Sequence, residues 1–284
     1  LVMLPIWAIL LGVVFASLTR HKAQWREFVL ICALSICSHI LTDLITSWGT
    51  QIFAPLSDYS PALGITFVID PIFTLIIATA LLIAAVKHSR ITARVGLVVL
   101  TSYVALQFVL KQQAENIAEA YIIKEQLGSA HVFAMPQPVS PFNWKLIVTA
   151  GEQQRVAYVN LAASEASPLP NEKTAGFWDL PDFYQPAKHL AWQHYHIYSD
   201  DPNTKTVWMH PDFERYRRFA KYPALYRIDK TAHNDCVWFM DLRYTLPSYT
   251  TPFRYGMCKI GAQDWQPFRI KRFTENEREA VDPP

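Results

Sequence analysis

Charged residues are distributed unevenly along this chain of 284 residues, and this distribution most constrains how the chain can fold. The first 110 residues contain six Lys or Arg and four Asp or Glu side chains, so 40 of the 50 charges lie beyond them. The first part has a membrane-like composition and the second an ordinary globular one. The second part balances 20 positive against 20 negative charges, which disfavours a nucleic-acid-binding protein, and the high apolar content excludes disorder.

Four apolar segments lie within the first 110 residues. A helix that crosses the hydrocarbon core of a membrane needs about 20 predominantly apolar residues. The first segment is apolar from Leu1 and reaches about 27 Å as a helix, so we expect its start, and a further segment, to lie upstream of Leu1. The sequence predicts a membrane α-helical bundle of about four transmembrane helices, at residues 1–18, 28–48, 70–86 and 95–110.

The connections between these segments predict the orientation in the membrane. Residues 19–27 and 87–94 each carry three basic side chains, and residues 49–69 carry none. Because basic connections stay on the cytoplasmic side, we expect the first two inside and the third outside. Residues 111–284 then lie outside the cytoplasm. The alternative is that some of these segments are core helices of a soluble protein.

The pattern changes after Leu110. Apolar residues at helical spacing continue to Leu127, and Gly128 stands at a C′ position, which predicts that the fourth helix continues beyond the bilayer. Three prolines, at positions 136, 138 and 141, then indicate an extended linker.

Short strand-like runs follow and predict a small, mainly β extracytoplasmic domain. They lie at residues 144–149, 156–161, 237–244, 255–260 and 268–273. We therefore expect a transmembrane helical domain (1–110), a helix extension with a Pro-rich linker (111–143) and a mainly β domain (144–284).

The ionisable residues inside the apolar part are the strongest candidates for a functional site. His39 and Asp43 are four residues apart and share a helix face, with Thr42 and Thr46 on the same side. An imidazole and a carboxylate at this spacing can converge on one cation. Asp70 precedes Pro71 at the start of the third helix, at the same outer end.

These residues predict a metal site of His39, Asp43 and Asp70, with Thr42 and Thr46 orienting the ligands. The alternatives are structural. His39 can bond Asp43 simply to pack the bundle, and Asp70 can serve as a helix N-cap, a role compatible with metal binding.

Three ordered motifs carry a resemblance to a known family. They are His39-x-x-x-Asp43-x-x-Thr-Ser-Trp-Gly-Thr, then Ala-Pro-Leu-Ser at residues 54–57, then Ile-Asp-Pro-Ile-Phe-Thr at residues 69–74. With this spacing, the chain resembles the bacterial inner-membrane proteins of the LexA regulon that are described as metal-dependent hydrolases. Residues 141–144 and 241–244 are also similar to the soluble tail of that family.

The resemblance implies a membrane-embedded hydrolase in the bacterial inner membrane, with a divalent metal (Zn, Mn or Mg) and a periplasmic C-terminal domain. Family members carry further His and Asp motifs before the position of Leu1, which implies that this chain is truncated at its N-terminus. A site at the outer membrane face suits an amphiphilic ester or phosphoester substrate. The rival hypotheses are a membrane-anchored envelope protein whose β domain binds a partner, and an ion or proton carrier.

Two further groups lie in the second part of the chain. His189, His194 and His196 are close in sequence, and two histidines two apart on a strand could hold Zn²⁺, although a surface or packing role is the simpler expectation. Cys236 and Cys258 lie on two predicted strands. An oxidising compartment would allow them to pair if the strands are neighbours, and the sequence leaves that open.

Overall fold

The structure, a computed structural model, describes residues 1–231, 234–261 and 263–281. The chain divides into two compact units. The helical unit comprises Leu1–Lys111 and Met135–Pro141, and the C-terminal unit comprises Gln112–Ala134 and Phe142–Pro284.

Four helices make up most of the helical unit, at α1 (Leu4–Leu18), α2 (Trp25–Leu44), α3 (Pro71–Lys87) and α4 (Arg90–Lys124), the last of which runs on into the C-terminal unit. In the described part of the chain, two helices are long and apolar enough to cross a membrane, at Lys22–Leu44 and Arg90–Lys124. The helices α1 and α3 are apolar but shorter, with 15 and 17 residues. The helical region therefore contains two candidate membrane spans, fewer than the four expected from the sequence.

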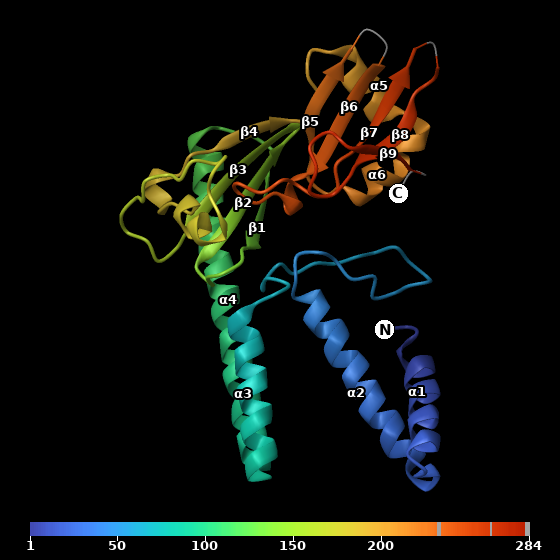
Figure 1. Ribbon diagram of the computed structural model, residues 1–284. Helices are drawn as coiled ribbons and strands as arrows, with labels where there is room; N and C mark the ends of the chain where they lie inside the picture. Colours follow the sequence, from blue (N-terminus) through green and yellow to red (C-terminus); the bar gives the residue numbers. More distant parts are fainter. Residues whose placement is uncertain (232–233, 262, 282–284) are drawn as a thin grey trace. The chain divides into compact units, whose positions relative to one another are not determined.

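Small side chains let these helices approach closely in pairs. Ala8, Gly12 and Ala16 are the buried residues of α1, at four-residue intervals. A Cβ at Gly12 would lie 2.5 Å from Cγ2 of Val29 on α2. A Cβ at Gly96 of α4 would likewise collide with Ala80 of α3. Helices in membranes pack through such small residues, and Figure 1 shows α1 beside α2 and α3 beside α4.

Most of the first sheet lies in the C-terminal unit, and it follows chain order, β1-β2-β3-β4. The pairs β2/β3 and β3/β4 are antiparallel. Its strands are β1 (His131–Pro136), β2 (Asn143–Ala150), β3 (Gln153–Asn160) and β4 (Gln193–His196). The strand β1 lies where the prolines predicted a linker. Of the others, β2 and β3 lie close to the predicted runs at 144–149 and 156–161.

A second antiparallel sheet has the order β5-β6-β7-β8-β9. Two helices, α5 (Pro202–Met209) and α6 (Glu214–Phe219), lie on one of its faces (Figure 1). The strands are β5 (Pro223–Lys230), β6 (Asn234–Asp241), β7 (Tyr255–Ile260), β8 (Gln266–Ile270) and β9 (Arg278–Ala280).

The sequence of β6 explains why the second sheet is covered on both faces. Val237 and Phe239 pack with Trp208 and Phe213 under the helices, while Cys236 and Trp238 point to the opposite face. Because neighbouring residues of a strand face opposite sides, a continuous apolar run requires cover on each side. The two sheets also share a core that joins β2 and β3 to β5 and β6.

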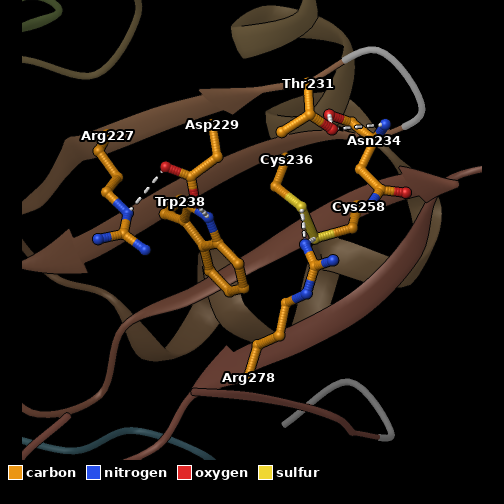
Figure 2. Close-up of a disulfide and its surroundings, with 8 residues drawn as sticks. All are labelled: Arg227, Asp229, Thr231, Asn234, Cys236, Trp238, Cys258 and Arg278. Carbon is orange, nitrogen blue, oxygen red and sulfur yellow. Dashed lines mark hydrogen bonds and ion pairs between the residues drawn. A yellow bond between two sulfur atoms is a disulfide. The ribbon is translucent and has the colours of Figure 1, made fainter. Parts of the chain in front are cut away.

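Cys236 and Cys258 form a disulfide. They are register partners on the neighbouring strands β6 and β7, so the pairing that the sequence left open is present. Arg278 of β9 reaches over the bond, with Nη1 2.7 Å from Sγ of Cys236 (Figure 2). The disulfide thus lies within the apolar face that Trp238 and Ile270 build.

Candidate functional site

His39 and Asp43 come together on α2. Nε2 of His39 lies 3.5 Å from Oδ2 of Asp43, as the four-residue spacing predicts. The two side chains are 76% and 48% exposed, so both keep surface that a ligand could reach. This pair is the part of the predicted site that the structure brings into contact.

Thr42 lies on α2, whereas Thr46 lies just beyond its last residue, Leu44, rather than on the helix face predicted for it. Both bond to the backbone of the helix. Oγ1 of Thr42 donates to the carbonyl of His39 at 2.8 Å, and Oγ1 of Thr46 donates to the carbonyl of Asp43 at 2.7 Å. Such bonds to a preceding turn are common for Thr in helices. The two hydroxyls therefore support the backbone next to the pair.

Asp70 is the N-cap of α3. Its Oδ1 accepts hydrogen bonds from the backbone N–H groups of Ile72 and Phe73, at 2.9 and 3.0 Å. An Asp cap followed by Pro at the first helical position is a favoured helix start. The structural role that the sequence allowed for Asp70 is present.

The other oxygen of Asp70 is bonded to side chains of α4. Oδ2 accepts from the hydroxyl of Tyr103 at 2.7 Å and from Nε2 of Gln107 at 3.3 Å. Gln107 also donates to the Tyr103 hydroxyl at 2.9 Å. A carboxylate offers about four acceptor positions, and these four donors occupy them. The network ties α3 to α4.

Sequence reasoning missed Tyr103 and Gln107. A signal was available, since they are four residues apart on one face of an apolar segment and Gln is costly in hydrocarbon. Oε1 of Gln107 is buried and has no hydrogen-bond partner among the described atoms. It lies beside a cavity with about 10 Å³ of room, lined also by Asp70 and residues 136–141. This space fits about one water molecule and no substrate.

Within the described ranges, no group of three or more His, Cys, Asp and Glu side chains is arranged to hold a metal ion. The pair His39–Asp43 and the carboxylate of Asp70 are therefore two polar centres. A metal site formed by all three residues stays a prediction.

The three histidines that the sequence singled out, His189, His194 and His196, lie in or near β4. His194 and His196 are exposed and stand opposite Arg155 and Gln153 of β3, and His189 precedes the strand. The surface role expected for them agrees with this exposure.

A buried lysine is the strongest feature of the C-terminal unit that the sequence did not reveal. Lys145 on β2 has no exposed surface, and its Nζ donates to the carbonyls of Leu242, Arg243 and Thr245 and to Oγ1 of Thr245. Burial lowers the pKa of Lys145 to about 7. Lys145 on the first sheet thereby binds the turn at residues 242–245, which follows β6 of the second sheet.

The same turn holds a buried ion pair. Asp241 accepts hydrogen bonds from Nε and Nη2 of Arg243, at 2.9 and 2.7 Å, and from the backbone N–H of Lys221. Both charged side chains are almost completely buried. The Asp-Leu-Arg-Tyr motif at residues 241–244 is thus a structural turn, which a sequence motif alone could not distinguish from a catalytic one.

The helical region matches a protein family. Residues 1–114 match the family model described as YdjM inner membrane protein. Neither a curated protein nor a solved structure matches the chain. The helical region is therefore similar to an inner-membrane protein family, and its two long apolar helices fit that location.

Proposed function

We propose that this inner-membrane protein is a membrane-embedded, metal-dependent hydrolase with its site at the outer membrane face. The observation that carries the proposal is the contact between His39 and Asp43 on an apolar helix. Ionisable groups inside a membrane helix are expensive and rarely lack a function.

The geometry of this pair fits a divalent cation. Two ligands bound tetrahedrally at about 2.1 Å from one metal lie about 3.4 Å apart. Nε2 of His39 and Oδ2 of Asp43 are separated by 3.5 Å, and both side chains keep exposed surface. His39 and Asp43 would hold the metal, which in hydrolases lowers the pKa of a bound water and polarises the scissile bond.

Asp70 fits a metal less well in this conformation. Its four acceptor positions are taken by Ile72, Phe73, Tyr103 and Gln107. As a ligand, it would have to give up the bonds to Tyr103 and Gln107 while keeping those of the helix cap.

The proposed topology has four spans with the C-terminal unit in the periplasm. The connections 19–27 and 87–94 are basic and 49–69 lacks Lys and Arg, which supports alternating sides. The pairing of α1 with α2 and of α3 with α4 supports two helical hairpins. The disulfide between Cys236 and Cys258 supports an oxidising compartment.

The proposed substrate is an amphiphilic ester or phosphoester, because a site at the outer membrane face is accessible to molecules that lie partly in the membrane.

The test is metal content and hydrolysis in the full chain, purified from bacterial membranes in detergent. After incubation with Zn²⁺ or Mn²⁺ and removal of excess ion, we expect His39→Ala and Asp43→Ala each to reduce bound metal about tenfold or more. His21→Ala, in the exposed first connection, serves as the matched control and should retain it.

Asp70→Asn separates the two roles of Asp70. The amide oxygen can still cap α3, so a loss of metal in a folded variant would identify Asp70 as a ligand. Two results together would contradict the hydrolase proposal: equal metal content in the unsubstituted chain and in the His39→Ala/Asp43→Ala variant, and no hydrolysis of a p-nitrophenyl ester or phosphodiester. They would favour the membrane-anchored envelope protein instead.

A second candidate function is a membrane-anchored envelope protein whose outer domain binds a partner. The observation that favours it is an exposed aromatic pair. Phe177 and Trp178 stack edge to face at 5.4 Å, and Trp178 is 88% exposed. A photo-crosslinker at position 178 should give a discrete adduct in cells if this surface binds a protein, and none if it does not.

A further inference from the structure

A cavity of about 380 Å³ opens between the two sheets of the C-terminal unit. Its walls come from β3 and β4 of the first sheet, from β5 and β6 of the second, and from the segment 245–251. Cavities that bind small molecules have volumes of about 300–1,000 Å³. The cavity is therefore large enough for a ligand of two or three rings.

Hydroxyl groups dominate its lining. Eight of its fifteen lining residues are Ser, Thr or Tyr. Each charged residue of the lining either has bonding partners already or lies next to a residue of opposite charge. Glu275 accepts from the hydroxyls of Tyr226 and Thr250, at 2.8 and 3.1 Å, and pairs with Arg254 at 3.6 Å. Glu172 and Lys173 are adjacent and opposite in sign. Such a lining favours hydrogen bonds to a neutral ligand over the capture of an ion.

Two tyrosines line the cavity beside these hydroxyl groups. Tyr158 and Tyr195 lie on neighbouring strands of the first sheet, and the hydroxyl of Tyr195 donates to Oε1 of Gln193 at 2.8 Å. The amide nitrogen of Gln193 stays available to a ligand on the same wall. Burial raises the pKa of Tyr195, which keeps its hydroxyl protonated.

The cavity is also held in shape before any ligand enters. Lys145 binds the carbonyls of Leu242, Arg243 and Thr245, so the turn that leads into the wall segment 245–251 is fixed to β2. A site formed in advance loses less conformational entropy when its ligand binds.

We infer that this cavity binds an uncharged, hydroxyl-rich ligand, a short saccharide. Aromatic rings contact the C–H faces of a sugar, while hydroxyl and amide groups bond its oxygens. The inference is independent of the proposed hydrolase, because no residue of the helical unit takes part.

The test is binding of neutral trisaccharides (chitotriose, maltotriose and cellotriose) to the full chain in detergent, measured by titration calorimetry. We expect a dissociation constant below about 1 mM for at least one of them. In Tyr195→Ala the dissociation constant should rise about tenfold. The matched control Trp178→Ala removes an exposed aromatic side chain outside the cavity and should change it less than twofold.

Tyr195→Phe guards against misfolding, because it keeps the ring and removes only the hydroxyl. It should bind with an intermediate dissociation constant. Absence of binding by all three sugars at 10 mM, as a rough ceiling for specific sites, would overturn the inference. So would sugar binding unaffected by Tyr195→Ala. Choline chloride and inorganic phosphate are the charged probes, and binding of either that depends on Tyr195 would mean that the cavity takes an ion instead.

Discussion

Lys145 shows how one residue can determine the arrangement of the C-terminal unit. It lies on β2, yet its hydrogen-bond acceptors lie about 100 positions further along the chain. A lysine is almost never fully buried unless it has partners. Four oxygens around Nζ accept its hydrogen bonds, so the buried amine has partners and the turn has a donor.

We predict that Lys145→Met destabilises the C-terminal unit by about 2–4 kcal/mol. Methionine is similar in size but cannot donate, so the carbonyls of Arg243 and Thr245 lose the donor that Nζ supplies, while the carbonyl of Leu242 keeps the hydroxyl of Thr245. The measurement is urea unfolding followed by tryptophan fluorescence. Lys188→Met, at an exposed position, is the control and should change the free energy of unfolding by less than about 0.5 kcal/mol. Equal stability of the two variants would contradict the role given to Lys145.

The lowered pKa of Lys145 also predicts a pH dependence. Between pH 7 and the ordinary value of 10.5, the unfolded chain carries the proton on this residue and the folded chain does not. Because the unfolded state binds more protons, the free energy of unfolding should rise with pH over this window. The contribution is on the order of 1 kcal/mol per pH unit, and it should vanish below pH 7. Lys145→Met should lose this slope, and an unchanged slope would refute the assignment.

At the scale of elements, contacts between neighbouring strands and helices depend on a few small residues. Gly256 on β7 is one of them. A Cβ at this position would collide with the carbonyl oxygen of Val237 and with the backbone of Trp238 on β6. The close approach of β6 and β7 therefore requires glycine.

Gly256→Ala should destabilise the second sheet by about 3 kcal/mol or more, since the obstacle is backbone that cannot move aside. Gly151→Ala is the comparison, because a Cβ there meets nothing within 4 Å and the cost is only that of its φ of +61°. We expect about 1 kcal/mol for it. Thermal unfolding monitored by near-UV circular dichroism would measure both, and similar losses would show that crowding at Gly256 is unimportant.

At the scale of the whole molecule, the redox state of the four cysteines indicates the cellular compartment of the C-terminal unit. Cys236 and Cys258 are joined in the C-terminal unit, whereas Cys32 and Cys37 on α2 are free. A C-terminal unit exposed to an oxidising compartment would form the bond in cells, and a cytoplasmic one would be kept reduced.

We predict that two thiols react with a maleimide reagent in denatured protein that was trapped without reduction, and four after reduction. Cys236→Ser should leave three reactive thiols without reduction. A phosphatase fusion after the C-terminus should be active, and a fluorescent protein at the same place dark. Four reactive thiols before reduction, together with an inactive phosphatase, would place the C-terminal unit in the cytoplasm.

The sequence by itself determined the features that depend on local pattern. The apolar segments predicted the positions of four helices, of which two are long enough to be candidate membrane spans. The spacing of His39 and Asp43 predicted their contact, whereas the orientation in the membrane stays a prediction. The strand-like runs predicted most residues of β2, β3, β6 and β7. These features are readable because one helix face or one strand face is defined by residues a few positions apart.

The tertiary structure decided what depends on residues far apart in the chain. It gave Asp70 its partners Tyr103 and Gln107 on another helix, made Cys236 and Cys258 neighbours, and buried Lys145 against a turn from the second sheet. It also placed the cavity between two sheets whose strands are separated in sequence. None of these pairs has a fixed spacing, so the register of strands and the packing of small residues determine them, and both require the folded chain.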